Sequence, residues 1–185
     1  MTEGFWTHEE GSTIMFEYLV DTHPTRLDNA LTQDDIKQIC RLVRGGPIEE
    51  PGRDFLYEIV SNSRNGIDVD KIDYLLRDTQ KINVPYCSFN HERIMLGTRV
   101  VDNQICYPEN KAFEIKKLFD SRYNMYRDCY YHRVTQSIEC LILDILMETH
   151  DILYNYLEAI YDPEQYLNLE DSVLHEVRLS TEPEL

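Results

Sequence analysis

The chain has 185 residues, 42% of them hydrophobic, and a formal net charge of −16. That length suggests one domain with room for a trailing piece, and such a chain buries roughly 70% of its unfolded surface, enough for a core. A surface this acidic repels phosphate polymers, so nucleic acid is not expected as a partner through a broad basic face, whereas one nucleotide could still bind a local pocket of Lys and Arg.

The first predicted element covers residues 6–23, where apolar residues recur at helical spacing. Thr7 is a suitable N-cap, with Glu10 three residues later as in a capping box. His8 and Glu9 therefore fall in the first turn. From the residues alone, Glu9 is interpreted as an acid that favours the helix dipole and His8 as a surface residue.

A second helix is predicted from Thr32 to Val43, after a loop over residues 24–31 that begins at Pro24. Gly45-Gly46-Pro47 ends this helix. Residues 45–54 are rich in Gly, Pro and Glu and are expected to form a surface loop.

The most informative stretch is residues 55–78, FLYEIVSNSRNGIDVDKIDYLLRD. Its first six residues are apolar at near-helical spacing, a loop rich in Asn and Ser follows, and a helix is predicted to start at Asp68, a good N-cap. One face of that helix is apolar and consists of Ile72, Leu75, Leu76 and Thr79. The opposite face is polar and consists of Asp70, Tyr74, Arg77 and Asp78, with Lys71 at its edge. This polar face is either a solvated helix surface or a binding site.

After a break at residues 83–85, Phe89 to Met95 is expected to be a short helix. Two β-rich runs, Gly97 to Val101 and Gln104 to Tyr107, flank Asp102-Asn103 and predict a hairpin with a two-residue loop.

Glu109 to Thr149 contains no Gly or Pro and shows helical spacing throughout. About forty residues is long for one helix, so a bend or two helices are expected. Leu153 to Ile160, a turn at Asp162-Pro163 and a last helix from Leu169 to Leu179 complete the chain. The predicted fold is mainly α with one small β-hairpin.

No apolar run approaches the roughly 20 residues that cross a membrane, and no secretory apolar segment follows Met1. The cysteines are an odd number, widely spaced and without a Cys-x-x-Cys pair: Cys40, Cys87, Cys106, Cys129 and Cys140. Reduced thiols, location in the nucleus or cytoplasm and no zinc ribbon are expected.

The run FLYEIVSN-x-RNGIDVDK-x-DY-x-x-RD closely resembles the SAM-and-HD-domain deoxynucleoside triphosphate (dNTP) triphosphohydrolases. The resemblance extends from Trp6 through most of the chain, including WTHE-x-GS-x-x-MFE-x-L near the start and STEPEL at the end. It implies an incomplete HD-type helical domain. The family reaction, a part of dNTP pool control and antiviral restriction, converts a dNTP into a deoxynucleoside and triphosphate.

The resemblance also implies roles for individual residues. Asp70 would be a metal ligand, and His8 with Glu9 would supply general acid catalysis. Substrate would be bound by Lys71 and Arg122 at the phosphates, Tyr74 and Asp78 at the sugar, and Tyr130. Asp70, Tyr74 and Asp78 are expected to face one concavity shared with His8 and Arg122. An allosteric nucleotide, GTP or dGTP in the family, would be bound by Arg93, His132 and Arg133. For two of these residues a structural role remains an alternative to ligand binding: Arg93 as a solvated surface charge and Tyr130 as part of a helix core.

The family's metal, a divalent or transition ion such as Zn, Mn, Fe or Mg, is bound by a His, an adjacent His-Asp pair and a distant Asp. Only the last has a counterpart here, Asp70, and one carboxylate does not hold such an ion by itself. His150-Asp151 lies downstream at a helix end and is not expected to be the metal pair. The SAM domain and C-terminal lobe also have no counterpart, and Pro108, Asn110 and Glu114 stand where a second allosteric site has basic or amide residues.

Three hypotheses follow from this pattern. The chain is an incomplete form of the dNTP triphosphohydrolase, with little activity by itself. Alternatively it is an inactive truncated paralogue or isoform that forms oligomers with full-length relatives and modulates them. A helical interaction module unrelated to nucleotides is the third, which the central motif disfavours.

Overall fold

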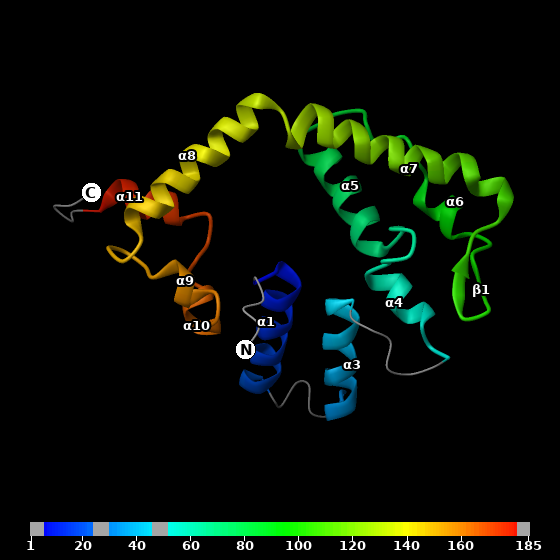
Figure 1. Cartoon of the computed structure of the whole chain (residues 1–185), viewed down its shortest axis with the longest axis horizontal. Coiled ribbons are helices and arrows are strands. Elements are labelled where there is room, and N and C mark those ends of the chain that lie inside the picture. The colour runs from blue at the N-terminus through cyan, green and yellow to red at the C-terminus, as the bar shows by residue number, and fades with distance from the viewer. Residues whose placement is uncertain (1–5, 24–29, 46–51, 181–185) are drawn as a thin grey trace. The chain divides into compact units, whose positions relative to one another are not determined.

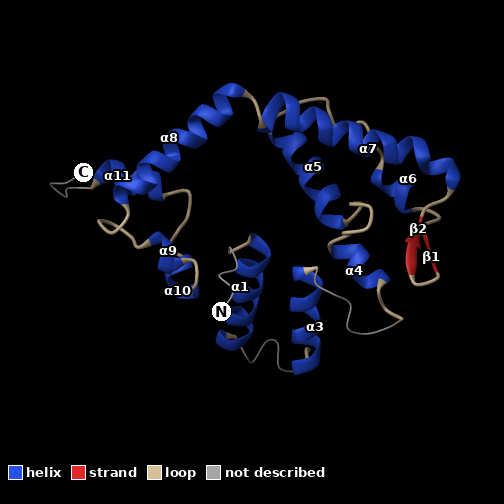
Figure 2. Cartoon of the chain, viewed as in Figure 1, coloured by secondary structure: helices blue, strands red, loops and turns tan. Residues whose placement is uncertain are grey.

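The computed structural model describes residues 6–23, 30–45 and 52–180 (Figure 1). In this part of the chain, helices dominate and two short strands form the only sheet (Figure 2). The chain divides into two compact units, one of Met1–Cys40 with Ser137–Leu185 and one of Arg41–Gln136. The mainly α class with one hairpin is confirmed. No helix in the described ranges is long and apolar enough to cross a membrane.

In the first unit, helix α1 covers His8–Thr22 and begins as the sequence predicts. The Thr7 hydroxyl accepts a hydrogen bond from the Glu10 N–H at 3.3 Å. Gly11 is required by packing, because a Cβ at this position would lie 2.4 Å from the Trp6 ring. The Trp6 ring in turn lies 6.2 Å from that of Tyr166, which connects α1 to the C-terminal part of the same unit.

Helix α3 covers Gln33–Arg44, close to the predicted range. Thr32 and Asp35 cap it reciprocally, since the Asp35 carboxylate accepts from the Thr32 N–H at 2.8 Å and the Thr32 hydroxyl accepts from the Asp35 N–H at 3.2 Å. Residues 24–29 and 46–51, which contain most of the two predicted loops, lie outside the described residues, as does the end of the STEPEL run.

Three short helices form the C-terminal part of the described chain, and the last is shorter than its predicted range of Leu169 to Leu179. They are α9 (Tyr156–Ala159), α10 (Pro163–Tyr166) and α11 (Val173–Leu179). The expected turn at residues 162–163 is instead the start of α10. Asp162 accepts hydrogen bonds from the N–H groups of Glu164 and Gln165, and Pro163 occupies the first turn, where its missing N–H costs nothing.

In the second unit, the core lies between α5 (Val69–Lys81), α6 (His91–Met95) and α7 (Ala112–Met125). Its buried residues come from these helices and the segment before α6: Leu75, Phe89, Ile94, Leu118 and Met125. The apolar face predicted for α5 supplies Leu75 to this core, so the opposite, polar face remains available for other contacts.

The hairpin pairs β1 (Arg99–Val101) with β2 (Gln104–Cys106) in antiparallel register, and the short α4 (Phe55–Val60) contacts β2. Asp102 and Asn103 form the two-residue loop with φ of 49° and 62°. Asp and Asn tolerate this left-handed backbone better than most residues, which explains the sharp reversal here.

The long helical region is interrupted, as its length predicts. A 3₁₀ turn (η1, Glu109–Lys111) precedes α7, and a π turn (η2, Tyr126–Tyr130) follows it before α8 (Arg133–Thr149) begins. In the π turn the Tyr131 N–H donates to the Tyr126 carbonyl at 2.8 Å, five residues back. Such single wide turns occur frequently at functional sites.

Candidate functional site

The loop before α5 fixes where the polar face of that helix begins. Asn62 is buried, and its side-chain carbonyl accepts from the N–H groups of Arg64 and Asn65 while its amide donates to the Ile67 carbonyl. Asp68 then caps α5, accepting from the Lys71 N–H at 2.8 Å and from the Asn62 N–H at 3.1 Å. Local polar contacts therefore set the register of Asp70, Tyr74 and Asp78.

Lys71 lies at the edge of this face and is only 17% exposed at its side chain. Its ammonium is 3.7 Å from the Asp68 carboxylate. That pair is long for a hydrogen bond, so the ammonium remains able to turn toward an anion.

Asp70 is exposed in the first turn of α5. Among the described residues, no group of three or more His, Cys, Asp or Glu side chains is placed to hold a metal ion. His150 and Asp151 lie 3.8 Å apart in the first unit without such a group. The described residues therefore do not make up the metal site that the resemblance implies.

Tyr74, Arg122 and Tyr126 meet where α5 packs on α7. The Arg122 guanidinium lies over the Tyr126 ring, 4.5 Å from its centroid. Burial raises the pKa of Tyr74, and Arg122 is close enough to oppose that rise. Within the described chain, the Arg122 Nε is buried without a hydrogen-bond partner, and no carboxylate forms a salt bridge with this side chain.

Asp78 and Tyr130 are joined by a short hydrogen bond, in which the Tyr130 hydroxyl donates to one Asp78 carboxylate oxygen at 2.6 Å. Burial, and then this bond to a carboxylate, raise the pKa of Tyr130, so its hydroxyl stays protonated near neutral pH. The edge of the Tyr130 ring faces Tyr126 at 5.0 Å between centroids. Tyr130 therefore lies in the polar cluster while also contacting the core.

We call the five side chains Tyr74, Asp78, Arg122, Tyr126 and Tyr130 the tyrosine–arginine cluster. The sequence nominated four of them as substrate-binding residues. Tyr126 was missed because it is one of 13 tyrosines and carried no motif signal, whereas its position four residues after Arg122 could have indicated the contact.

The residues nominated for an allosteric nucleotide, Arg93, His132 and Arg133, are exposed. Arg93 is 3.8 Å from the Glu114 carboxylate, which also contacts Lys117. His132 accepts a hydrogen bond from the Val134 N–H through Nδ1, and Arg133 begins α8. The assignment of these three to a nucleotide remains a prediction.

His8 and Glu9 lie in the first unit, at the start of α1, with Nε2 of His8 3.2 Å from the Glu9 carboxylate. The pKa of Glu9 lies below its ordinary value, mainly because its own backbone N–H donates to the carboxylate, with smaller contributions from Thr7 and His8. The pair has the composition expected for proton transfer. The catalytic role of the pair stays a prediction.

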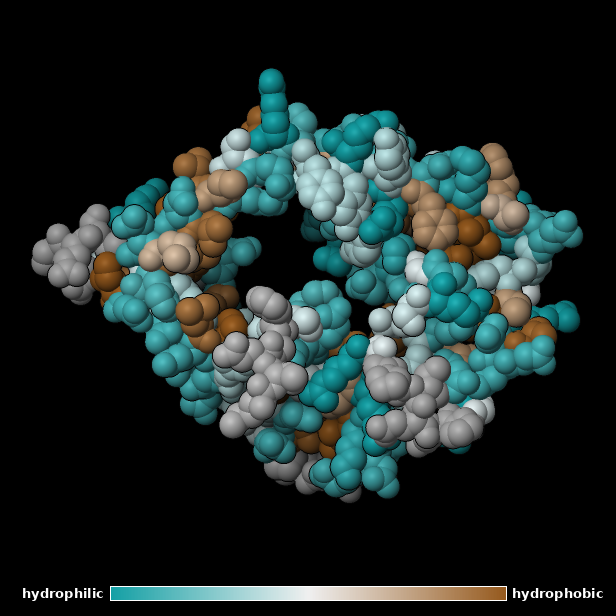
Figure 3. All heavy atoms as spheres, in the orientation of Figure 1, coloured by the Kyte–Doolittle hydropathy of each residue, from teal (hydrophilic) through white to brown (hydrophobic). Residues whose placement is uncertain are grey.

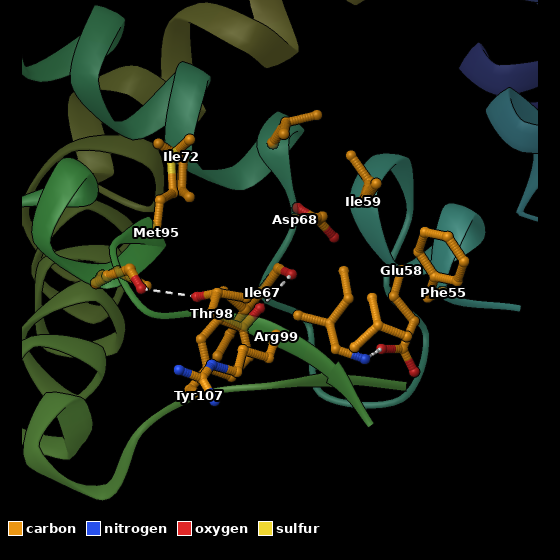
Figure 4. Close-up of a pocket in the computed structure, with 14 residues that line it drawn as sticks. Phe55, Glu58, Ile59, Ile67, Asp68, Ile72, Met95, Thr98, Arg99 and Tyr107 are labelled. Carbon is orange, nitrogen blue, oxygen red and sulfur yellow. Dashed lines mark hydrogen bonds between the residues drawn. The ribbon is translucent and has the colours of Figure 1, made fainter. Parts of the chain in front are cut away.

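A separate pocket of about 360 Å³ lies in the second unit between α4, α5, α6 and the hairpin (Figure 4). Its walls are mostly aliphatic and include Ile59, Ile67, Ile72 and Met95. Ile72 and Tyr74 are two residues apart on α5 and so point to nearly opposite sides of that helix. The pocket is therefore distinct from the tyrosine–arginine cluster.

No known family model matches the chain. It is 37% identical over 179 residues to the deoxynucleoside triphosphate triphosphohydrolase SAMHD1 homolog of Dictyostelium discoideum, covering 96% of this chain and 34% of that protein. It is 34% identical to the human SAMHD1 enzyme, covering 97% and 33% of the two chains. The chain belongs to the SAM-and-HD-domain deoxynucleoside triphosphate triphosphohydrolase family.

An HD domain-containing protein of Acanthamoeba polyphaga mimivirus is also similar, with 36% identity over 128 residues, which cover 68% of this chain and 27% of that protein. The chain spans about a third of the length of the SAMHD1 proteins that it matches. The alignment therefore covers about a third of each of these relatives, and on this chain it includes the tyrosine–arginine cluster.

Proposed function

We propose that this chain binds a dNTP through the tyrosine–arginine cluster and Lys71, as the deoxynucleotide-binding part of a dNTP triphosphohydrolase. In that reaction the oxygen of water bonds to the α-phosphorus, the bond from this phosphorus to the sugar 5′-oxygen breaks, and that oxygen takes up a proton. The products are triphosphate and a deoxynucleoside. Similarity to relatives named for this reaction supports the proposal.

The proposal depends mainly on one observation, that Arg122 has no carboxylate partner in the described part of the chain. In a chain of net charge −16, this half-buried guanidinium has no carboxylate partner among the described residues, and its Nε is left without an acceptor. A guanidinium without a carboxylate partner keeps its full charge, and a phosphate at the accessible part of this side chain would neutralise it. Tyr74 beside it offers a flat surface for the sugar.

At the other side of the cluster, Asp78 uses one oxygen to accept from Tyr130. A carboxylate has about four acceptor positions, so the second oxygen can accept from the 3′-hydroxyl of a deoxyribose. Tyr130 fixes the orientation of the carboxylate, which reduces the entropy lost when the sugar binds.

His8 and Glu9 are proposed to act as a general acid with its neighbouring carboxylate. The metal that the resemblance implies, Zn, Mn, Fe or Mg, would activate water and polarise the phosphoryl oxygen. Asp70 is the single nominated ligand, and no group of three His, Cys, Asp or Glu side chains in the described residues could hold such an ion. We therefore assign no step of the reaction to the metal.

The test is ligand binding by the purified full chain, measured by calorimetry with dATP and with 2′,3′-dideoxy-ATP. We expect dATP to bind, Arg122→Ala to weaken binding about 10-fold or more, and loss of the 3′-hydroxyl to weaken it several-fold. Arg127→Ala is the matched control, because Arg127 lies on the same helical segment but is paired with Asp128 at 2.6 Å. Equal weakening by the two substitutions, or no binding of dATP at all, would contradict the proposal.

A second candidate is a non-catalytic partner that forms an oligomer with a full-length relative. One face of α8 favours it, because large apolar side chains are exposed there, 61% for Leu141 and 51% for Ile138. Figure 3 shows apolar surface around this helix. Co-sedimentation with a SAMHD1 relative that is lost on Ile138→Asp with Leu141→Asp would support this candidate, with a GTP- or dGTP-dependent increase as the family resemblance implies.

A further inference from the structure

We propose that Tyr126 is a positioning residue of the deoxynucleotide site, acting through Arg122 by keeping the guanidinium over its ring without a carboxylate partner among the described residues, so that its charge is available to phosphate. This inference rests on the proposed function and deepens it. Tyr126 was not among the residues that the sequence nominated, and it touches both an anion-binding candidate and a sugar-binding candidate of the cluster.

The geometry shows why this side chain matters. The Arg122 guanidinium carbon is 4.5 Å from the centre of the Tyr126 ring, within the range of a cation–π interaction. A ring contacts the flat face of a guanidinium and does not use the N–H groups at its edge, which can bond to other partners such as Tyr74 or an anion. A carboxylate partner would instead consume those donors and neutralise the charge.

Other arginines of the second unit are paired with carboxylates. Arg64, Arg77 and Arg127 each form a salt bridge with a carboxylate close to it in the sequence: Glu58, Asp73 and Asp128 respectively. Arg122 differs because an aromatic ring, and not an acid, supports it, while its Nε stays buried without an acceptor. In a chain this acidic, support by a neutral ring keeps one guanidinium available to an external anion.

The backbone at Tyr126 contributes to this arrangement. Tyr126 directly follows α7 as its C-cap, four residues after Arg122, a spacing that places the two side chains on one helix face. The π turn begins at the same residue, and within it the Tyr126 and Tyr130 rings meet nearly edge-to-face, at 5.0 Å and 83°. Tyr131 adds a third ring 5.4 Å from Tyr126. One side chain therefore contacts both Arg122 and the tyrosine that orients Asp78.

The test measures binding of inorganic tripolyphosphate to the full chain by calorimetry, with Tyr126→Leu, Tyr126→Phe and the double variant with Arg122→Ala. We expect Tyr126→Leu to weaken binding about 3- to 20-fold and Tyr126→Phe to stay within about 2-fold of the unchanged chain, since Phe retains the ring. When Arg122 is already alanine, Tyr126→Leu should have no further effect, because the two side chains act as one unit.

Tyr123→Leu is the matched control. Tyr123 also lies under an arginine, Arg127 at 5.6 Å, but it is 63% exposed and outside the cluster, so its loss should not change tripolyphosphate affinity. If Tyr126→Leu does not fold, as judged by circular dichroism, Tyr126→Met is used instead, because its unbranched, flexible chain adapts better to the space of the ring while still removing the ring, and it carries the same expectation.

The outcomes separate this inference from the proposed function. Tripolyphosphate binding that Arg122→Ala weakens but Tyr126→Leu leaves unchanged, or an equal loss from Tyr126→Leu whether or not Arg122 is present, overturns the positioning role alone. Failure of the unchanged chain to bind tripolyphosphate or dATP overturns the proposed function and the inference with it.

Discussion

At the scale of single residues, the Tyr130–Asp78 hydrogen bond connects positions 52 residues apart in the sequence. Burial and the Asp78 carboxylate both favour the protonated phenol and so raise the pKa of Tyr130. Because the folded state then binds this proton more tightly than the unfolded chain, the contribution to stability is complete below the ordinary tyrosine pKa. It is lost as pH rises from about 10 through the folded-state value.

Replacing Asp78 with asparagine tests this coupling. Asp78→Asn removes the negative charge that opposes ionisation, so we expect Tyr130 to ionise at lower pH than in the unchanged chain, although burial still keeps its pKa above the ordinary value. The measurement is a pH titration by NMR of chain labelled at tyrosine, with Tyr130 assigned from a Tyr130→Phe variant. An unchanged Tyr130 titration in Asp78→Asn would show that the carboxylate has no influence on the phenol.

Residue-level prediction from sequence succeeds where the physics is local. Asp68 could be identified as a cap because its carboxylate reaches the N–H three residues later, and this depends on backbone geometry alone. The contact of Arg122 with Tyr74 requires the packing of α5 on α7, which no local rule gives. The expectation that both residues face one concavity came from the shared helix face together with the family resemblance. Neither a local rule nor the family resemblance indicated Tyr126.

At the scale of elements, the start of α5 depends on Asp68. Asp68→Ala removes the cap and the contact with the Asn62 N–H, so we expect the free energy of unfolding to fall by about 1–2 kcal/mol. Urea denaturation followed by circular dichroism measures this change. Asp73→Ala is the control, since Asp73 is exposed on the same helix and forms only a surface pair with Arg77, and its effect should be within about 0.5 kcal/mol of zero. Equal effects of the two substitutions would contradict the role of the cap.

The hairpin loop gives a second element-scale prediction. Asn103 has φ of 62°, a conformation that a β-branched residue adopts only with strain. Asn103→Val should therefore destabilise the hairpin by about 1–3 kcal/mol, whereas Asn103→Gly should be neutral or slightly stabilising. Hydrogen exchange at the Ile105 N–H, which donates to Glu58 at 2.7 Å, reports the local opening. Faster exchange in the glycine variant than in the valine variant would refute this explanation of the loop.

Element prediction failed mainly in the C-terminal segment, for a physical reason. Asp162-Pro163 satisfies the rule for a turn and the rule for a helix start, and only the two N–H groups bonded to Asp162 decide for the helix. The helix expected from Leu169 begins at Val173, after Asn168 has bonded its amide to the Glu164 carbonyl and closed the preceding turn. Polar side chains that form local hydrogen bonds compete with helix extension. The spacing of apolar residues, from which the helix was predicted, gives no information about these bonds.

At the scale of the whole molecule, the charge of −16 restricts how an anionic activator can bind. Arg93 is an allosteric candidate, yet it lies 3.8 Å from Glu114, a buried carboxylate that also pairs with Lys117. Glu114 would repel a nucleotide phosphate at this position. We therefore expect dGTP to cause little association of the unchanged chain in sedimentation velocity, and Glu114→Gln to increase dGTP affinity several-fold. Association at micromolar dGTP that Glu114→Gln does not strengthen would contradict this expectation.

The last prediction concerns catalysis by the chain itself. Water becomes a nucleophile near neutral pH when a firmly bound metal lowers its pKa, and such a metal needs about three or four protein ligands. The described residues offer Asp70 without a second and third ligand beside it, so a divalent ion should bind there weakly. We therefore expect little release of triphosphate from dATP by the purified chain with manganese and dGTP, although dATP still binds through Arg122. Rapid turnover that Asp70→Ala abolishes would contradict this prediction and show that residues outside the described set complete the metal site. Turnover that survives Asp70→Ala would instead remove Asp70 from the catalytic centre.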